Sequence, residues 1–233
     1  NVSVLAAIRT TNQKWRALSQ SLGWFWACCY VLHLLLKKMG IKFQAYRFAY
    51  QPIPSVRKLA IANNTTFKWI DAFHTDLLVE DRKEHIVQAR LARGDLCLAA
   101  YKESEMVAFI WLAMSHYPED DTRCDYQLES PPLVWDYDVY VAPKYRVTRL
   151  FAQLWEEAND DLRARQIRWS VSRISAFNAA SIRAHVRSGA KLTGSAFFWQ
   201  MGQTQLLMSS QKPFIHLSRQ SRPIFRFNAP KPF

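Results

Sequence analysis

The spacing of hydrophobic positions changes along the chain, and its most marked feature is an apolar run near the N-terminus. Residues 22–36 are nearly all apolar or aromatic, and Lys37 and Lys38 follow them. Fifteen residues of helix reach about 22 Å, which is short of the roughly 30 Å hydrocarbon layer of a bilayer. We therefore predict a helix that either lies in one leaflet of a membrane or packs on the core of the protein or of a second subunit.

Beyond residue 40 the pattern alternates between the periods of strands and of helices. Runs of aromatic and β-branched residues predict strands, and apolar residues three or four apart predict helices. The predicted strands are 43–50, 96–101, 106–113, 133–141, 167–172, 196–201 and 205–208, and the predicted helices are 66–78, 82–92, 149–163 and 179–187. The acidic segment 116–132 is predicted to be a loop, either with a lid-like role or as a solvated excursion.

Composition and charge narrow the class of protein. A chain of 233 residues with 49% hydrophobic and 21% charged side chains fits one globular domain with a terminal appendage. The net charge of +12 is unevenly distributed, because all nineteen acidic residues lie between positions 71 and 161. Residues 1–70 carry ten lysines and arginines and residues 162–233 carry twelve. These acid-free flanks predict an anionic partner: nucleic acid, a membrane surface or a phosphate-bearing cofactor.

Aromatic residues help to choose among these partners. Trp24, Trp26 and Tyr30 accompany the cations of the first flank, which is typical of a membrane interface and not of a nucleic-acid site. The tail 211–233 interleaves cations with phenylalanines and suits a membrane surface, a dimer contact or RNA, but we do not expect nucleic acid as the partner. The four cysteines form no C-x-x-C pair and the six histidines are scattered, so neither a disulfide framework nor a metal site is expected. We predict a cytoplasmic protein, peripherally or monotopically associated with the inner membrane.

Two motifs accompany this pattern of elements. The first is V-x-P-x-Y-R at Val141, Pro143, Tyr145 and Arg146, and the second is N-x-x-S-x-x-x-H-x-x-x-G at Asn178, Ser181, His185 and Gly189. The elements run in the order strand, two helices, three strands, helix, strand, helix, two strands. This order and the two motifs resemble the GNAT acyltransferase superfamily over about residues 43–210.

The resemblance implies a fold, a division into domains and a cofactor. The fold is α+β, with a central mixed sheet flanked by helices in residues 43–210, an apolar and basic helical segment in 1–42, and the tail 211–233. The cofactor is acyl-CoA, whose pyrophosphate binds backbone N–H groups and a helix N-terminus at the turn after strand 133–141. The implied cofactor-binding residues are Val139, Tyr140, Val141, Arg146, Val147, Thr148, Arg149, Asn178 and Ser181.

The turn departs from the family pattern in one respect. Val147, Arg149 and Phe151 stand where the family usually has small residues, and Val147 cannot easily copy the torsions of glycine. Either Arg146 and Arg149 supply compensating charge, or the cofactor sits differently or is absent. We favour retained binding, because helical N–H groups remain available without glycine.

The resemblance also implies catalytic residues. His185 stands at the position of the family's tyrosine, the general acid that protonates the leaving thiolate, and an imidazole can do this near neutral pH; the alternative is a partly buried helix residue without a proton role. Asp136 and Asp138, two apart on a strand, are expected to share a sheet face and to supply a base or an orienting carboxylate, with burial raising the pKa. Their alternative is ordinary pairing with Arg146 or Arg149. Glu129 and His116 are weaker candidates.

The substrate is less closely defined than the reaction class. Residues 138–146 and 168–178 are similar to a GNAT branch that includes bacterial ceramide synthases, which implies transfer of a long acyl chain to a sphingoid base or other lipid amine. The donor is acyl-CoA or an acyl-carrier protein, and a homodimer is one arrangement that the flanks would suit. Two alternatives stay open: acetylation of a small soluble amine, and a non-catalytic, membrane-associated adaptor built on a degenerate GNAT fold.

Overall fold

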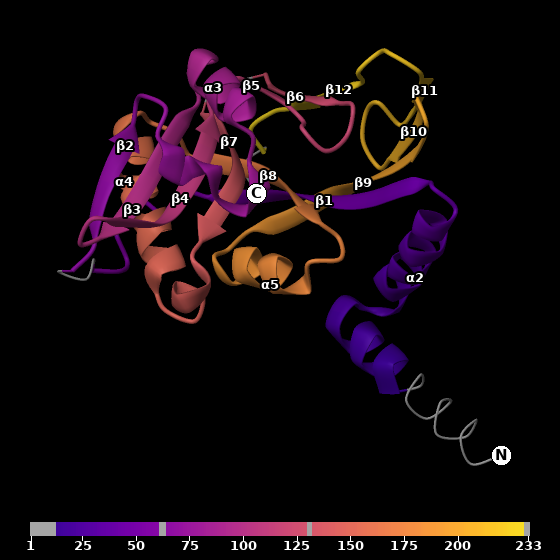
Figure 1. Cartoon of the computed structure of the whole chain (residues 1–233), viewed down its shortest axis with the longest axis horizontal. Coiled ribbons are helices and arrows are strands. Elements are labelled where there is room, and N and C mark those ends of the chain that lie inside the picture. Colours follow the sequence, from indigo (N-terminus) through magenta and orange to yellow (C-terminus); the bar gives the residue numbers. More distant parts are fainter. Residues whose placement is uncertain (1–12, 61–63, 130–131, 231–233) are drawn as a thin grey trace. The chain divides into compact units, whose positions relative to one another are not determined.

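A computed structural model of the chain describes residues 13–60, 64–129 and 132–230 (Figure 1). The chain forms two compact units. Unit 1 holds residues 1–50, 119–125 and 173–225, and unit 2 holds residues 51–118, 126–172 and 226–233. The chain passes from one unit to the other several times, so neither is a contiguous stretch of sequence.

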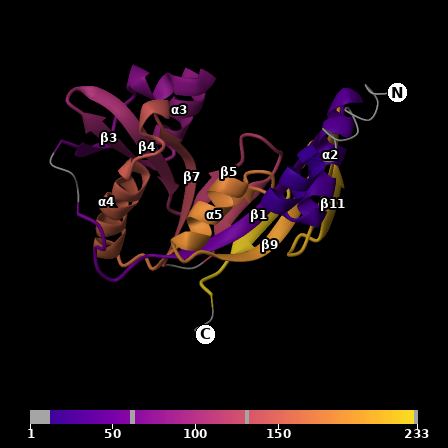
Figure 2. The ribbon, with the colours of Figure 1, turned by 90° about the horizontal axis from the view of Figure 1, so that it is seen from below.

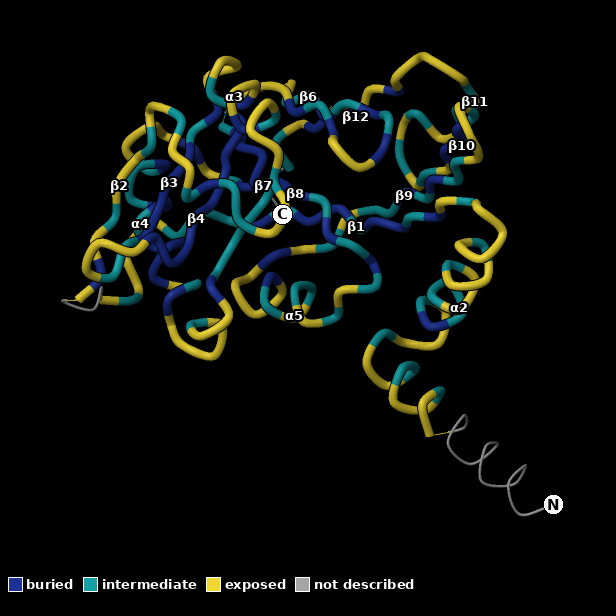
Figure 3. The backbone as a smooth tube through the Cα atoms, in the orientation of Figure 1, coloured by how far each residue is buried: buried dark blue, intermediate teal, exposed yellow. Residues whose placement is uncertain are grey.

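Unit 2 is built on a mixed sheet. Its strands are β2 (Thr66–Ile70), β3 (Leu96–Lys102), β4 (Glu105–Ala113), β7 (Leu133–Val141) and the first part of β8 (Trp169–Ser175), in the order β2-β3-β4-β7-β8. Neighbours are antiparallel except β7 and β8, which are parallel. Helix α4 (Leu150–Ala164) buries Leu150, Leu154 and Ala158 against this sheet. The strands β3, β4 and β7 are mostly buried (dark blue in Figure 3). The mixed sheet flanked by helices confirms the predicted α+β fold class.

The predicted helix 66–78 is wrong. Its first part is the edge strand β2, followed by the 3₁₀ segment η1 (Thr75–Asp81), and only then by helix α3 (Glu84–Ala92). Phe67 and Trp69 lie opposite Ala100 and Leu98 of β3. Pairing with a neighbouring strand therefore decides the conformation here, and two aromatic residues two apart are the period of a strand.

The predicted loop 116–132 contains two short strands. They are β5 (His116–Pro118) and β6 (Asp125–Leu128), which form a three-stranded sheet with β12 (Ile224–Phe227) in the order β12-β6-β5. The rings of Tyr126 and Trp135 stack with centroids 4.3 Å apart, and Phe227 lies 5.2 Å from Trp135. The segment is therefore part of the packed structure and not a solvated excursion.

The tail is also more than an appendage. Residues 215–218 form strand β11 (Ile215–Ser218), and β12 buries Phe225 and Phe227 almost completely. The ring of Phe225 lies 5.2 Å from that of Phe48. These two phenylalanines are therefore core residues and not surface groups for a lipid or an RNA base. Phe233 lies outside the described residues.

The described residues of unit 1 contain an antiparallel sheet and helices. The strands are β1 (Lys42–Pro52), β9 (Lys191–Met201), β10 (Thr204–Ser209) and β11, in the order β1-β9-β10-β11. The helices are α2 (Trp24–Lys38) and α5 (Ala179–Arg187), with residues 13–22 also helical before α2. The four cysteines all lie among the described residues, and none of them forms a disulfide.

Helix α2 confirms the helix predicted for residues 22–36 and lies along β1 and β9 (Figure 2). Trp26 stacks on Phe197 of β9 with centroids 5.7 Å apart, and His33 Nδ1 donates a hydrogen bond of 2.7 Å to the carbonyl oxygen of Phe43. One face of α2 thus packs on the protein's own core, as one of the two alternatives predicted. Among the residues that the structure describes, there is no helix with the length and apolar character needed to cross a bilayer.

Candidate active site

The turn between β7 and α4 in unit 2 carries the first sequence motif. It consists of a 3₁₀ turn, η2 (Pro143–Tyr145), and the residues that lead into α4 at Leu150. Thr148 accepts a hydrogen bond from the Leu150 N–H at 3.2 Å, and its hydroxyl donates to the Tyr145 carbonyl at 2.7 Å. Thr148 therefore orders the entry to the helix, in the manner of the hydroxyl caps that precede many helices.

The backbone of this turn does not require glycine. Residues 142–149 are all described, and none of them has a positive φ. Val147 is 96% exposed, so its side chain points to solvent and is not forced against the backbone. The absence of small residues therefore costs the turn no strain, since only positive φ values favour glycine.

The electrostatics of the turn suit a phosphate-bearing ligand. The first turn of α4 contains no acidic residue, and the N–H groups there have no partner within the helix. Arg146 and Arg149 are exposed beside it. Arg146 Nε donates to the Val141 carbonyl at 2.9 Å, which holds this guanidinium over the end of β7. A helix N-terminus with two neighbouring cations is a favourable environment for an anion.

Asp138 lies in a β-bulge of β7. Phe109 of β4 is opposite Tyr140, whereas Trp111 is opposite Tyr137, so Asp138 and Val139 together face a single residue of β4. Asp138 has φ 47°, the left-handed conformation typical of one kind of bulge. An extra residue in a strand shifts the alternation of its side chains by one position.

The bulge makes the predicted common face of Asp136 and Asp138 wrong. The side chain of Asp136 lies on the face of the sheet opposite to that of Tyr137, as in a regular strand. Its carboxylate accepts a hydrogen bond from the Ser170 hydroxyl of the parallel neighbour β8. Asp138 instead accepts a hydrogen bond from Arg90. The guanidinium of Arg90 lies 4.9 Å from the centroid of the Tyr137 ring, so Asp138 and Arg90 are on the Tyr137 face of the sheet, opposite to Asp136. Two carboxylates that a regular strand would place side by side are therefore separated by the sheet.

Two arginines hold the Asp138 carboxylate. Arg82 Nε donates to both carboxylate oxygens, at 3.0 and 2.9 Å, and further bonds come from Arg82 Nη2 and Arg90 Nη1. The side chains of Asp138 and Arg82 are 16% exposed and that of Arg90 is 7% exposed. The predicted pairing with Arg146 or Arg149 is not found here, because the partners come from the segment that leads into α3 and from α3 itself.

This environment sets the ionisation of Asp138. Burial by itself would raise the pKa of the carboxyl, but the hydrogen bonds from Arg82 and the positive charges of Arg90 and Arg82 outweigh it and hold the pKa below its ordinary value. The expectation that burial would raise this pKa is therefore wrong in direction for Asp138. A carboxylate with a lowered pKa is a weak proton acceptor and a strong fixed negative charge.

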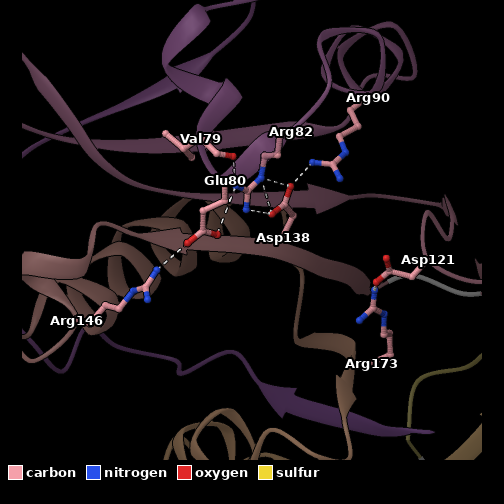
Figure 4. A network of polar contacts seen from close by, with 8 residues as sticks. All are labelled: Val79, Glu80, Arg82, Arg90, Asp121, Asp138, Arg146 and Arg173. Atoms are coloured by element: carbon pink, nitrogen blue, oxygen red, sulfur yellow. Dashed lines mark hydrogen bonds and ion pairs between the residues drawn. The ribbon is translucent and has the colours of Figure 1, made fainter. Parts of the chain in front are cut away.

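A chain of alternating charges extends from Asp138 to Arg146 in the turn before α4, as Figure 4 shows. Arg82 lies 3.7 Å from Glu80, and Glu80 in turn accepts a hydrogen bond of 2.7 Å from Arg146 Nη2. Arg82 also donates to the Val79 carbonyl at 2.6 Å. Within unit 2 the structure thus links two of the predicted site residues, Asp138 and Arg146, through groups that no sequence motif indicated.

A second buried carboxylate lies near this cluster. Asp95, at the start of β3, accepts hydrogen bonds from the Tyr137 hydroxyl and from Arg93. Burial and the nearby Asp95 charge raise the pKa of Tyr137, so the phenol stays protonated and can keep donating. Of the weaker candidates, Glu129 bonds Arg226, and His116 is an exposed residue of β5.

The second motif lies in unit 1, at helix α5. Asn178 is the N-cap, and its side-chain oxygen accepts a hydrogen bond of 3.0 Å from the Ser181 N–H. Gly189 follows the helix with φ 91°. The bounds of α5 confirm the helix predicted for residues 179–187.

His185 lies on the buried side of α5, at 8% exposure. Its Nδ1 is 2.9 Å from the Ser181 carbonyl oxygen, and because a carbonyl only accepts, Nδ1 is the donor. The Ser181 hydroxyl lies 3.5 Å from the same nitrogen. The main chain thus fixes the ring orientation and keeps a proton on Nδ1, so Nε2 is the ring atom that can exchange a proton with a ligand.

Sequence reasoning missed Arg82, Arg90 and Asp95. Arg82 and Arg90 lie 56 and 48 residues from Asp138 along the chain. The only signal available was the placement of Arg90 between the apolar residues Ala89 and Leu91 of a predicted helix; Arg82 lies in a charged stretch and gave no such signal. Their guanidinium groups lie over aromatic rings, Arg82 at 5.0 Å from Phe109 and Arg90 at 5.4 Å from Trp111, which is how a cation can be kept against a core.

Solved structures with a similar fold are distant from this chain. A functionally unknown conserved protein from Staphylococcus epidermidis is 11% identical with a TM-score of 0.48, covering 72% of this chain and 65% of its own. A tandem GNAT protein from the clavulanic acid biosynthesis pathway is 12% identical with a TM-score of 0.48, covering 71% and 56% respectively. The aminoglycoside 6'-N-acetyltransferase AAC(6')-Ih from Acinetobacter baumannii is 16% identical with a TM-score of 0.42, covering 54% and 89%.

The chain thus spans about two thirds or less of the length of the first two structures. No curated protein matches it. The sequence model of the acetyltransferase (GNAT) family, in contrast, matches residues 60–190, which is more than half of the chain. That range includes the bulged strand β7, the turn before α4 and helix α5, and so both motifs. The chain therefore belongs to the acetyltransferase (GNAT) family.

Proposed function

We propose that the protein is an acyl-CoA-dependent N-acyltransferase that transfers a long acyl chain to the primary amine of a lipid, such as a sphingoid base. The observation that carries the reaction class is the strand–turn–helix of β7 and α4, with an acid-free helix N-terminus flanked by Arg146 and Arg149. Family membership supports the same reaction class, because the GNAT family uses acetyl-CoA or acyl-CoA. An acyl-carrier protein presents the same phosphopantetheine arm and is the alternative donor.

The donor would be held by main-chain and cationic groups. Val139, Tyr140 and Val141 lie at the end of β7, beyond its pairing with β8, which stops at Trp135, and their main chain would contact the donor. Thr148 orders the turn that presents the first N–H groups of α4. Arg146 and Arg149 supply positive charge for the pyrophosphate. Asn178 and Ser181 form the capped start of α5, where the pantetheine region would bind. Bound acyl-CoA supplies the activated thioester carbonyl.

The chain's own residues then handle charge and protons. The amine nitrogen forms a bond to the carbonyl carbon, the carbon–sulfur bond breaks, the nitrogen loses one proton and the thiolate gains one. His185, in its imidazolium form, delivers that proton from Nε2 while Nδ1 stays hydrogen-bonded to the Ser181 carbonyl, and the neutral ring is reprotonated from solvent after the reaction. Backbone donors of β7 polarise the carbonyl. No covalent intermediate with the protein is needed.

The two aspartates take different parts in this proposal. Asp138 stays ionised and, as a positioning residue, fixes the bulge and the arginines around it. Asp136 is the remaining carboxylate on β7, and its bond to Ser170 holds it against β8. We assign Asp136 as the candidate base.

The lipid acceptor is supported by features outside the turn. The N-terminal apolar helix α2 exposes large hydrophobic side chains, among them Trp24 at 70% and Leu35 at 54% exposure. An enzyme that acts on small soluble amines has no use for such a surface, whereas an enzyme whose acceptor resides in a membrane does. The same feature leads us to propose association with a membrane surface from the cytoplasmic side.

The experiment is mass spectrometry of the products formed from palmitoyl-CoA and a panel of amines that includes sphinganine, 3-oxosphinganine, an amino acid and an aminoglycoside. We expect an N-acyl sphingoid product in detergent or with vesicles. A product from the soluble amines alone would replace the lipid acceptor by a small one. No product, together with no rise in melting temperature on adding coenzyme A, would refute the enzyme and favour an adaptor, since a ligand that binds the native state stabilises it.

A further inference from the structure

The positive charge of the protein is concentrated in unit 1. Unit 1 contains fifteen lysines and arginines and four acidic residues, a net charge of +11, whereas unit 2 contains sixteen and fifteen, a net charge of +1. Three of the four acids in unit 1 are bound to arginines. Glu119 and Asp121 accept bonds from Arg173, and Asp125 accepts one from Arg222 at 2.8 Å. The uncompensated cations of the molecule are therefore mostly in unit 1.

One face of the sheet in unit 1 is apolar across all four strands. Residues directly opposite each other on neighbouring strands share a face, and the pairing gives two apolar rows. The first row is Phe43, Trp199, Leu206 and Leu217, and the second is Ala45, Phe197, Met208 and Ile215, each running from β1 through β9 and β10 to β11.

Helix α2 covers only half of these two rows. It packs on Phe43, Phe197 and Trp199, where Trp26, Cys29 and Leu36 join the same hydrophobic cluster. The other half is left bare, because Met208, Ile215 and Leu217 are 44%, 68% and 67% exposed. Beside α2 the bare half begins with a hollow of about 320 Å³ that is lined by Ile41, Trp199, Met201, Thr204 and Leu206.

The outer side of α2 is apolar as well. Trp24, Leu32, Leu35 and Met39 are spaced so that they share one side of a helix, and they are 70%, 41%, 54% and 72% exposed. We name these four residues, together with Met208, Ile215 and Leu217, the apolar face of unit 1. Both parts of it open on the side of the sheet where α2 lies.

Cations stand at the ends of both parts of the apolar face. Lys37 and Lys38 end α2, and Lys212 and Arg219 flank β11 on either side, all four exposed. Apolar side chains in the middle and cations at the margins are the arrangement of proteins that insert a shallow apolar surface between anionic lipid headgroups.

We propose that unit 1 docks on an anionic lipid bilayer through the apolar face of unit 1. The inference deepens the proposed function, because it names the surface by which the enzyme would reach a lipid amine. Charge selects the bilayer over a second copy of the chain: two units of net charge +11 repel each other, whereas an anionic surface attracts each of them.

The test is sedimentation of the full chain with sucrose-loaded vesicles in the absence of any substrate. Vesicles of phosphatidylcholine and phosphatidylglycerol, in a ratio of roughly three to one, are compared with vesicles of phosphatidylcholine alone. Binding is expected to the anionic vesicles, and it should weaken as salt rises, because salt screens the attraction of the marginal cations.

Matched variants locate the contact. Leu32→Ser with Leu35→Ser removes the outer stripe of α2, and Ile215→Ser with Leu217→Ser removes the bare half of the sheet. The control is Val56→Ser with Val186→Ser, which loses two valines that are 65% and 48% exposed outside the apolar face. Each face variant is expected to lower the partition constant on anionic vesicles by roughly tenfold or more, and the control to leave it unchanged. Melting temperatures check that all variants are folded.

The outcomes are distinguishable from those of the proposed function. Vesicle binding that both face variants weaken would support the apolar face even if no acyl transfer were detected with any amine. Absence of binding to anionic vesicles, or equal binding by all variants, would overturn it, even if the enzyme proved active on lipid amines in detergent. A lipid-free dimer that the face variants dissociate, seen by sedimentation velocity, would also overturn it and assign the face to a second copy.

Discussion

Replacing Asp138 by asparagine tests whether the ion cluster on β7 holds the bulge. Asparagine keeps the shape of the side chain and tolerates the left-handed conformation of this residue, φ 47°. The substitution removes the negative charge to which both Arg82 and Arg90 are bound. The two guanidinium groups then remain in their partly buried positions without this carboxylate. An alanine at this position would add backbone strain and would confuse the result.

The magnitude follows from burial. Removing one partner of a fully buried ion pair costs 3–5 kcal/mol. With the three side chains 7–16% exposed, we take the lower end, about 3 kcal/mol, since residual solvent screens the unpaired charges. In a chain of this size that lowers the melting temperature by roughly 6–12 °C. The control is Glu105→Gln, which breaks an exposed pair with Lys144 and should leave the melting temperature unchanged.

The pH dependence gives the prediction a sign. The pKa of Asp138 is lower in the folded protein than its ordinary value of 3.8. The contribution of Asp138 to the free energy of unfolding is therefore complete above pH 3.8. It is lost as the pH falls through the lowered pKa of the folded state. The difference in unfolding free energy between wild type and Asp138→Asn, measured in urea, should be constant from neutral pH to about pH 5 and then shrink. A variant as stable as wild type at neutral pH would refute this account of the bulge.

Three further predictions concern the proposed site and the core. His185→Ala and His185→Phe should lower kcat by 10²–10⁴-fold at saturating amine, the usual range for a lost general acid; unchanged turnover would remove His185 from the mechanism. Arg146→Ala and Arg149→Ala should raise the KM for acyl-CoA several-fold with little change in kcat, because a phosphate contact far from the thioester acts equally in ground and transition states. Phe225→Ala should destabilise the protein by about 3–5 kcal/mol in urea unfolding, because Phe225 is fully buried against Phe48; a loss near zero would mean that β12 is not part of the core.

Local signals predicted most of the strands and helices. The hairpin of β3 and β4 is visible as two apolar runs around a charged turn at 102–105, and α4 as an apolar stripe on a charged helix. The N-cap Asn178 was predictable because capping depends on residues three apart in the chain. In each case the residues that decide the structure are close in sequence.

The wrong predictions concern segments whose secondary structure depends on residues far away in the sequence. Strand β2 is too short for its period to be told from that of a helix, and β3 imposes its conformation. The two short strands of the segment 116–132 pack against aromatic residues about a hundred positions later in the chain. One example is Phe227, whose ring lies 6.1 Å from that of Tyr126. No local pattern in an acidic, proline-containing segment reports such a partner.

The chemistry of the candidate site was also not predictable from local sequence. One extra residue in β7, at the bulge of Asp138, changes the environment of that carboxylate. A regular β7 would place Asp136 and Asp138 on one face, where two like charges raise each other's pKa and favour a base. The bulge turns Asp138 to the opposite face, towards Arg82 and Arg90, where the pKa falls instead. The residue with positive φ in this bulge is Asp138, whereas glycine is usual at such a position. The sequence therefore contains no residue that would indicate the bulge. The negative charge fixed in this way keeps two arginines in place at the strand that leads into the turn before α4. Asp138, which its place in the sequence suggested as a base or an orienting carboxylate, is better explained as the anchor of that strand.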